Sequence, residues 1–464
     1  MPKKSTGRKA LTKKTAKTKG SSKKYQHKAG VKTDNKPIKI INKIKGMKDV
    51  MPEDFKYWDL VMRKAIELAK LYSYQRFDLP IIENTALYEK TCGKASNLVN
   101  KELYAYVTKS NDRIAVRPDI APSLIRAVLE HDYLANTSVF KSFWLGPTIR
   151  YDSTQGGRLR QYNQFSLNVL GNFGAAADAQ LILIGYNFFK ELQVDIEVHI
   201  NSLGCDECVS NYLEIIKDYF KERGKKAKLS VEAKKILLKN PLQILAVKDE
   251  KSQEVIEEIP PIVDHLCEHC RQRFETVLEY LDSLSIPYNL DTNLVNTRGF
   301  DCYTNTIFEF VPIIDGTKAA PLGGGGNFSA LADRLGVHDL QACGFGIDLE
   351  KTISKIRGKN IAVLNGDQAD IFIAQISDQA KCKTMLLFEE LRRAGFKVRE
   401  NFIQDSLKLQ LEEAELAKVK YTLILGQKEL LDDTIMIRDM ESGVQETIDL
   451  RKIVNELDKR LNIS

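Results

Sequence analysis

The chain has 464 residues, of which 43% are apolar and 28% charged, and it contains no apolar run long enough to cross a bilayer. The numbers fit a globular protein without a membrane-spanning helix, and the length allows two or three domains. Charge is uneven, since the first forty residues carry fourteen Lys/Arg against one acid, Asp34. Their charge of +13 leaves −6 for the rest of a chain whose net charge is +7.

Residues 1–40 are predicted to be a disordered basic tail because they offer almost nothing to bury. Such a tail could bind the phosphate backbone of nucleic acids in a salt-sensitive manner, or it could serve only to increase solubility. The tail lacks the apolar segment of a signal peptide and is rich in Lys rather than Arg, so we expect a cytoplasmic protein.

The next 160 residues alternate between helical and β-rich patterns. Apolar residues recur at helical spacing from Glu53 to Tyr72, where two acids suit the helix start. Two more helical patterns cover 122–130 and 175–192. Short β-rich runs lie between them at 76–80, 102–108, 114–118, 138–146 and 162–171.

Residues 201–285 are mainly helical and highly charged, which is typical of an insertion. They contain two CxxC pairs with 58 residues between them, Cys205/Cys208 and Cys267/Cys270. Paired CxxC motifs in a reducing compartment favour a tetrahedral Zn²⁺ site. The spacing exceeds that of a compact zinc ribbon, so four reduced thiols in a helical hairpin remain an alternative.

Strands resume at 286–291 and 302–311, followed by a Gly-rich run at 321–336. From about residue 360 the pattern changes to β-α-β-α-β-β, which predicts a separate small α/β domain over 360–464. The chain therefore divides into the tail, a core formed by 41–200 and 286–357, the insertion 201–285 and the C-terminal domain.

The stretch from Gly146 to Phe165 places three arginines, Arg150, Arg158 and Arg160, around a Gly-Gly turn. If 158–168 is a strand, alternation puts its polar residues on one face and Leu159, Phe165, Leu167 and Val169 on the other. A sheet that is packed on one side and open on the other has this pattern. Arginine suits bidentate phosphate capture and stacking on planar rings, which predicts a site for ATP. A merely solvated face is the alternative.

This stretch resembles motif 2 of class II aminoacyl-tRNA synthetases, and specifically of the histidyl-tRNA synthetase family. Six further segments agree in order: "GMKDVMPED", "FDLPIIENTALYEK", "VRPDIAPSLIRAVLE", "NTRGFDCYTNTIFEF", "GGGGNFSALADRLG" and "ACGFGIDLEK". The C-terminal block is similar to the anticodon-binding domain of that family. The resemblance implies an α+β fold, in which helices flank the class II antiparallel sheet, and a homodimer that acts on histidine, ATP and tRNA(His).

The family's ATP-binding and catalytic residues carry over onto several positions. Arg150 would bind the α-phosphate and Arg298 would face it from the opposite side. Arg158 and Lys351 would reach the distal phosphates, Tyr162 would stack on adenine and Asp152 would lie near its amino group. Mg²⁺ is expected on the triphosphate, held mainly by phosphate oxygens and water.

The amino-acid pocket departs from the family pattern. Asp119 and Ala121 replace Glu and Thr, Asn168 replaces Glu, Phe328 replaces Tyr, and Lys351 replaces the Arg of motif 3, whereas Gln164, Asp301 and Tyr303 are retained. Each lost hydrogen-bonding group would cost about 1–3 kcal/mol. The leading interpretation is ATP-dependent ligation of histidine to tRNA(His) through an adenylate. The alternatives are a non-catalytic paralogue that binds tRNA or regulates another protein, and activity on another amino acid.

Overall fold

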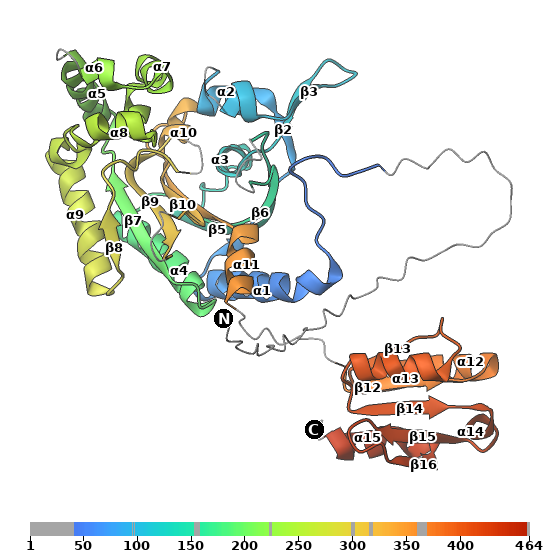
Figure 1. Ribbon diagram of the computed structural model, residues 1–464. Helices are drawn as coiled ribbons and strands as arrows, with labels where there is room; N and C mark the ends of the chain where they lie inside the picture. Colours follow the sequence, from blue (N-terminus) through green and yellow to red (C-terminus); the bar gives the residue numbers. More distant parts are fainter. Residues whose placement is uncertain are drawn as a thin grey trace, which may run out of the picture. The chain divides into compact units, whose positions relative to one another are not determined.

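The computed structural model describes residues 41–94, 96, 98–152, 158–221, 225–297, 302–314, 319–359 and 369–461 (Figure 1). The tail predicted for residues 1–40 lies outside these ranges. Within them, none of the helices is both long and apolar enough to span a bilayer.

An eight-stranded sheet forms the centre of the described part of the core, in the order β1-β5-β6-β11-β10-β9-β7-β8. The pairs β1–β5 and β7–β8 are parallel, and all other neighbours are antiparallel. The bounds are β1 Gln75–Arg76, β5 Val139–Ile149, β6 Gln161–Gly171, β7 Ile196–Ser202, β8 Tyr288–Leu290, β9 Thr304–Pro312, β10 Gly323–Asn327 and β11 Gln341–Asp348. This antiparallel-rich sheet with flanking helices confirms the predicted α+β class.

One face of the sheet packs against the helices α1 (Phe55–Leu71), α4 (Ala175–Glu191), α9 (Glu268–Ser283) and α11 (Leu349–Gly358). The helix predicted after Glu53 is confirmed, because Trp58, Val61, Ala65 and Leu68 recur every three or four residues and are buried. They join a core cluster that includes the apolar side of β6.

The opposite face carries α3 (Ala121–Glu130), which buries Leu124, Ile125 and Val128 against the sheet. A small antiparallel sheet and two short helices lie beside it. Their bounds are β2 Ile82–Asn84, β3 Ala105–Val107, β4 Arg113–Val116, α2 Thr85–Cys92 and α10 Ala330–Arg334, with a π-helical turn at Leu98–Glu102. The strand expected at 76–80 is shorter than predicted, since only Gln75–Arg76 pairs with β5.

The four consecutive glycines Gly323–Gly326 form most of β10, a central strand between β9 and β11. A Cβ atom on Gly325 would lie 2.0 Å from the carbonyl oxygen of Gly344, and one on Gly324 would lie 2.4 Å from Thr297 Oγ1. The run is glycine because neighbouring atoms occupy the volume of any side chain.

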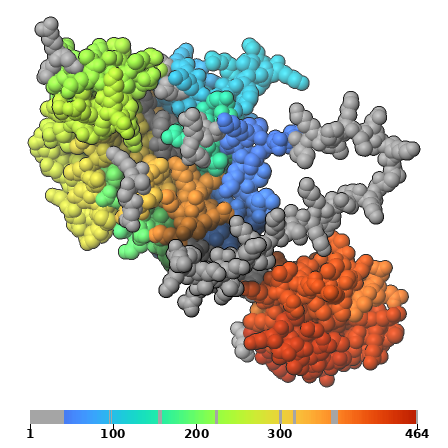
Figure 2. All heavy atoms as spheres, viewed as in Figure 1, coloured from blue at the N-terminus to red at the C-terminus, as the bar shows by residue number. Residues whose placement is uncertain are grey.

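The insertion consists of α5 (Asp206–Lys221), α6 (Lys225–Lys228), α7 (Val231–Lys239), η4 (Pro241–Ile244), α8 (Glu250–Glu257), η5 (Ile262–His265) and α9. Side chains from α5 to η5 form one continuous apolar cluster with α3 and with the residues before β9. In the space-filling view it forms a continuous surface with its neighbours rather than a separate arm (Figure 2). Arg273 on α9 donates to the fully buried Asp178 on α4 over 2.8 Å, which fixes α9 to the core.

The C-terminal unit has a five-stranded sheet within the described residues, in the order β13-β12-β14-β15-β16. Its elements are β12 Ile371–Gln375, α12 Asp378–Arg393, β13 Val398–Glu400, α13 Leu407–Leu416, β14 Tyr421–Leu425, α14 Gln427–Leu431, β15 Thr434–Asp439, β16 Gln445–Asp449, η6 Leu450–Lys452 and α15 Ile453–Leu461. The predicted elements β-α-β-α-β-β are observed as β12, α12, β13, α13, β14 and β15. The prediction missed the helices α14 and α15 and the edge strand β16. The sequence of β16, QETID, is mostly exposed at the sheet edge and carries little hydrophobic alternation.

Candidate functional site

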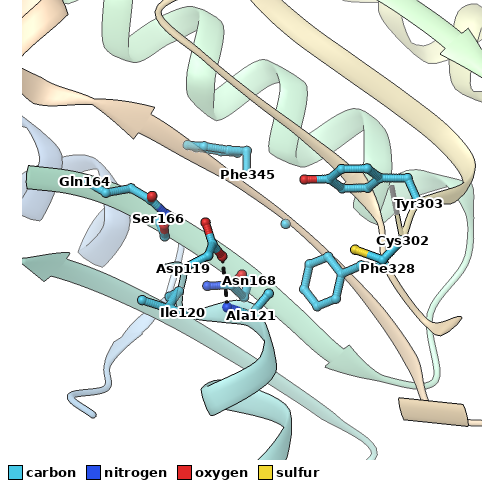
Figure 3. Close-up of a pocket in the computed structure, with 11 residues that line it drawn as sticks. Asp119, Ile120, Ala121, Gln164, Ser166, Asn168, Cys302, Tyr303, Phe328 and Phe345 are labelled. Carbon is cyan, nitrogen blue, oxygen red and sulfur yellow. Dashed lines mark hydrogen bonds between the residues drawn. The ribbon is translucent and has the colours of Figure 1, made fainter. Parts of the chain in front are cut away.

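A small cavity of about 20 Å³ lies where the start of α3 meets β6, β11 and the residue that follows β10 (Figure 3). It is lined by Asp119, Ile120, Ala121, Gln164, Ser166, Asn168, Cys302, Tyr303, Phe328, Gly344 and Phe345. The structure thus brings together six of the seven residues predicted to contact the amino acid. The seventh, Asp301, lies outside the described residues, immediately before Cys302.

The polar side of β6 forms one wall of this cavity. Gln164, Ser166 and Asn168 face it, whereas Phe165 and Leu167 pack on the other side of the sheet, as alternation predicts. The expectation that the polar side is open was wrong, since these three residues are 1–3% exposed. The helix α3 and the residues around Tyr303 cover the polar side of β6. The alternation of polar and apolar residues in a strand does not show which other segments pack over its polar side.

Asp119 joins the cavity to Arg150, the residue predicted to bind the α-phosphate. Asp119 Oδ1 accepts from the backbone N–H of Ala121 over 3.0 Å at the start of α3. Its other oxygen lies 3.9 Å from the Arg150 guanidinium, and Arg150 Nε donates to the carbonyl of Pro118 over 3.0 Å. The two side chains are 8% and 4% exposed for Arg150 and Asp119, so this cation and anion share a dry position beside the cavity.

The other two arginines of the hairpin do not lie on β6, which begins at Gln161. Arg158 is 64% exposed and lies 3.5 Å from Asp152, close to the segment 153–157 that the structure leaves undescribed. Arg160 stacks on the Tyr151 ring at 3.8 Å and donates to the carbonyl of Asp152 over 3.1 Å. The strand predicted over 158–168 therefore starts three residues late, because the backbone N–H of Arg160 bonds to Gly46.

Glu102 belongs to this charged group but was missed by sequence reasoning. Its backbone carbonyl accepts from Tyr151 N–H over 2.7 Å. Burial raises the pKa of the Glu102 carboxyl, and the nearby Arg150 opposes that rise. No sequence pattern in the π-helical turn at 98–102 signals this proximity.

Asn168 presents an amide donor inside the cavity. Its side chain is 3% exposed, and among the described residues its Nδ2 has no hydrogen-bond partner. A Cβ on Gly344 would lie 2.5 Å from Asn168 Oδ1, so glycine at position 344 leaves the room that this amide occupies. A buried donor without a partner costs about 1–3 kcal/mol, which a ligand with a matching acceptor would recover.

The rings of Tyr303 and Phe328 face Asp119 and Asn168 across the cavity (Figure 3). Asn327, next to Phe328, accepts from Thr304 Oγ1 over 3.0 Å and from Ser329 Oγ over 2.8 Å. Its side chain fixes the end of β10 rather than lining the cavity. Of the three residues at 327–329, Phe328 therefore lines the cavity, and Asn327 and Ser329 form a supporting network.

Tyr162 and Lys351, both predicted at the ATP side, do not line the cavity. Lys351 is 46% exposed in the first turn of α11, and its Nζ lies 3.3 Å from the carbonyl of Pro321. The neighbouring Glu350 accepts from both the backbone N–H and the side-chain amide of Asn163, over 2.8 and 3.0 Å. Burial raises the pKa of the Glu350 carboxyl to about 7.

Arg298 lies outside the described residues, so its predicted place opposite Arg150 stays a prediction. The residue before it is described: Thr297 Oγ1 donates to Glu309 on β9 over 2.8 Å. Five lining residues were not predicted as contacts of the amino acid. One of them, Ser166, lies on the predicted polar face of β6 between Gln164 and Asn168, and the other four are Ile120, Cys302, Gly344 and Phe345. Each of these four adjoins a predicted residue or lies within a quoted motif, and this proximity in sequence could have identified it as a lining residue.

The four cysteines of the CxxC pairs converge. Their sulfur atoms lie within 4.8 Å of one another, with Cys208 and Cys270 buried. They lie at the starts of two separate helices rather than in one helical hairpin.

Comparison with known proteins identifies the family of this chain. The histidyl-tRNA synthetase family matches residues 46–352, and the anticodon binding domain family matches residues 370–460. The chain belongs to the histidyl-tRNA synthetase family.

Within that family, a histidine–tRNA ligase from Dehalococcoides mccartyi is 32% identical over 418 residues, covering 90% of this chain and 99% of the relative. The ligase of Halothermothrix orenii is 34% identical over 89% of this chain and 98% of its own length. The apo histidyl-tRNA synthetase of S. aureus superposes with a TM-score of 0.73 at 27% identity, covering 90% of this chain and 99% of that structure.

Proposed function

We propose that this protein ligates histidine to tRNA(His) in two steps, using ATP. A carboxylate oxygen of histidine attacks the α-phosphorus, the bond to the bridging oxygen breaks, and pyrophosphate leaves. A hydroxyl of the terminal tRNA ribose then attacks the carbonyl carbon of the adenylate, and AMP leaves. The nucleophile of the first step already carries its charge, so positioning and charge neutralisation carry the catalysis.

The observation that carries the proposal is the buried contact between Arg150 and Asp119. The cation that would bind the phosphate, Arg150, thus lies beside a cavity whose wall includes the anion Asp119. An amino acid whose ammonium group meets Asp119 would direct its carboxylate towards the phosphate held by Arg150. Such an arrangement suits the joining of a zwitterion to a nucleotide.

The ATP side would be completed by residues with the roles predicted from the family. Arg158 and Lys351 would hold the distal phosphates, Tyr162 would stack on adenine, and Asp152 would accept from its amino group. Arg298 would approach the α-phosphate opposite Arg150. Mg²⁺ would bind mainly phosphate oxygens and water, which matches its preference for hard oxygen ligands.

In the amino-acid half, Asn168 distinguishes this chain from the family pattern. Its donor Nδ2, which has no partner among the described residues, suits a ring nitrogen that carries a lone pair. A neutral imidazole has one such nitrogen, and an imidazolium has none. Tyr303 and Phe328 would pack against the ring, Gln164 and Asp301 would bind its polar atoms, and Ala121 leaves room beside Asp119.

We further propose that the protein is a cytoplasmic homodimer with the domain boundaries given above, that residues 360–464 bind the anticodon region, and that the basic tail adds phosphate contacts. Deletion of residues 1–36 would then flatten the salt dependence of tRNA binding, measured by filter binding from low to high salt, without changing adenylate formation. An unchanged slope would remove the tail from RNA recognition.

The deciding experiment is ATP–pyrophosphate exchange with each of the twenty amino acids. Exchange that depends on histidine is expected. Exchange with another amino acid would reassign the substrate. Absence of exchange with every amino acid, despite tRNA binding, would replace the proposal with the non-catalytic alternative.

A further inference from the structure

Two helices of the insertion direct their N-terminal ends at the cysteine cluster. Cys205 immediately precedes α5, and Cys267 is the N-cap of α9. The carbonyl of each accepts from the fourth residue along, Val209 and Arg271, over 3.0 and 2.9 Å. The second cysteine of each pair therefore lies in the first helical turn, and both helices present the same Cys-x-x-Cys geometry.

This geometry suits a single tetrahedral ion. The four sulfurs lie within 4.8 Å of one another, and the Cys205 and Cys208 sulfurs are 3.6 Å apart. Four ligands about 2.3 Å from one Zn²⁺ occupy such a space, which is too small for several irons with their sulfides. Four thiolates around Zn²⁺ carry a net charge of −2, and the positive ends of two helices stabilise negative charge. The backbone N–H of Cys267 also donates to Cys208 Sγ over 3.2 Å.

The surrounding chain is shaped for this cluster. Gly204 has a φ of +69°, and a Cβ there would lie 2.5 Å from Cys208 Cβ and 2.8 Å from its sulfur. Glycine thus allows Cys208 to approach the chain that enters α5. Buried Leu266 packs with Cys208 and Cys270 and shields the sulfurs from water.

The cluster is connected to the segment that carries the cavity residues Cys302 and Tyr303. Asn305 accepts from Leu203 N–H and donates to the carbonyl of Gly204, each over 2.8 Å. Its side-chain Oδ1 lies 3.6 Å from Cys270 Sγ. Asn305 is two residues from Tyr303, so the cysteine cluster and the cavity share one short piece of backbone.

The insertion also holds the other end of this segment. Asn296 donates to Gln243 on η4, and Leu294 and Val295 belong to the same apolar cluster as the insertion helices. Asn296 and Asn305 are therefore each held by the insertion, Asn296 by Gln243 and Asn305 by Gly204 and Cys270.

We infer that the four cysteines bind one structural Zn²⁺, and that this ion positions Cys302 and Tyr303 in the wall of the amino-acid cavity. The ion closes the base of a 58-residue excursion and fixes the starts of α5 and α9. The positioning part of this inference rests on the proposed function, whereas the metal site does not.

Metal analysis of the full-length protein, purified under reducing conditions, tests the site directly. One zinc per chain is expected, with cobalt substitution giving the visible bands of a tetrahedral thiolate complex. Cys205→Ser should lose the zinc, and Cys205→His should retain it because imidazole is also a zinc ligand. Cys382→Ser, at an exposed cysteine of the C-terminal unit, is the matched control. A reduced, metal-free protein, an oxidised Cys205–Cys208 pair or a stoichiometric iron would overturn the zinc assignment.

The kinetics of the same variants test positioning. In Cys205→Ser, the KM for histidine in pyrophosphate exchange should rise roughly ten-fold to a hundred-fold, with a much smaller change in the KM for ATP. Cys205→His should restore both values. Equal changes in the two KM values, or none after zinc loss, would overturn the positioning role. A zinc-loaded protein without any exchange would instead refute the proposed function and leave the metal site standing.

Discussion

The two halves of the candidate active site are built differently. On the amino-acid side, Gln164, Ser166 and Asn168 are at most 3% exposed and lie on one strand of a central sheet. On the nucleotide side, Arg158 is 64% exposed and Lys351 is 46% exposed. Arg150 is the exception, since it belongs to the nucleotide side by its predicted role and to the buried side by its packing. Under the proposed roles, the small ligand would meet buried groups and the large charged one would meet exposed groups.

The largest effect is expected where the two halves meet. Arg150→Ala removes a preorganised cation beside the reacting phosphate, so exchange should fall by about 10²–10³-fold. It also removes the cation that lies 3.9 Å from buried Asp119 and should destabilise the fold. Thermal unfolding and pyrophosphate exchange measure the two consequences.

The double variant Arg150→Ala/Asp119→Asn separates stability from catalysis. Neutralising position 119 should recover much of the lost stability, whereas exchange should stay low because the variant lacks both Arg150 and the carboxylate proposed to bind the substrate ammonium. If exchange returns together with stability, Arg150 acts only through the fold.

Asn168→Leu tests the buried half with a substitution of similar volume. Loss of the amide should raise the KM for histidine about ten-fold, which corresponds to roughly 1–2 kcal/mol of hydrogen bonding. The ligand-free protein should not lose stability, because the removed Nδ2 has no partner among the described residues. An unchanged KM for histidine would show that the substrate does not use this donor.

Arg158→Ala tests the exposed half. Its side chain is flexible and solvated, so the KM for ATP should rise only several-fold while the KM for histidine stays the same. The matched control is Arg63→Ala, since Arg63 is 59% exposed on α1 beside Glu67. A loss as large as that of Arg150→Ala would mean that the nucleotide side is as preorganised as the cavity.

Glu350 connects the two halves of the candidate site, because it accepts hydrogen bonds from Asn163 on β6 and directly precedes Lys351 on α11. Its pKa is raised from 4.5 to about 7 in the folded protein, so the folded state holds an extra proton between these values. The contribution of protonated Glu350 to the free energy of unfolding is complete below pH 4.5. It is lost as the pH rises through 7, which lowers the free energy of unfolding by roughly 3 kcal/mol. Glu350→Gln should flatten this part of the free energy of unfolding against pH, measured by urea unfolding from pH 4.5 to 8. The same slope in the variant would assign the titration elsewhere.

The sequence predicted those features that depend on the spacing of residues close together in the chain. Alternation from Gln164 to Asn168 assigned the faces of β6, and the CxxC pairs identified cysteines that converge in space. It failed where distant segments decide the outcome. No periodic pattern in the sequence indicates which segments cover β6 or that this strand begins only after Arg160. The contact of Asn163 with Glu350 joins residues 187 positions apart and is equally absent from any local pattern.

The glycine strand β10 has a consequence for how this protein tolerates change. At all four positions from Gly323 to Gly326, the nearest atom to an added Cβ would lie at 2.0–2.6 Å, and most of these atoms belong to the main chain of β9 and β11. Even alanine there would force neighbouring strands apart. A saturation mutagenesis map should therefore show four adjacent intolerant codons whose residues have no side chain with which to contact a substrate.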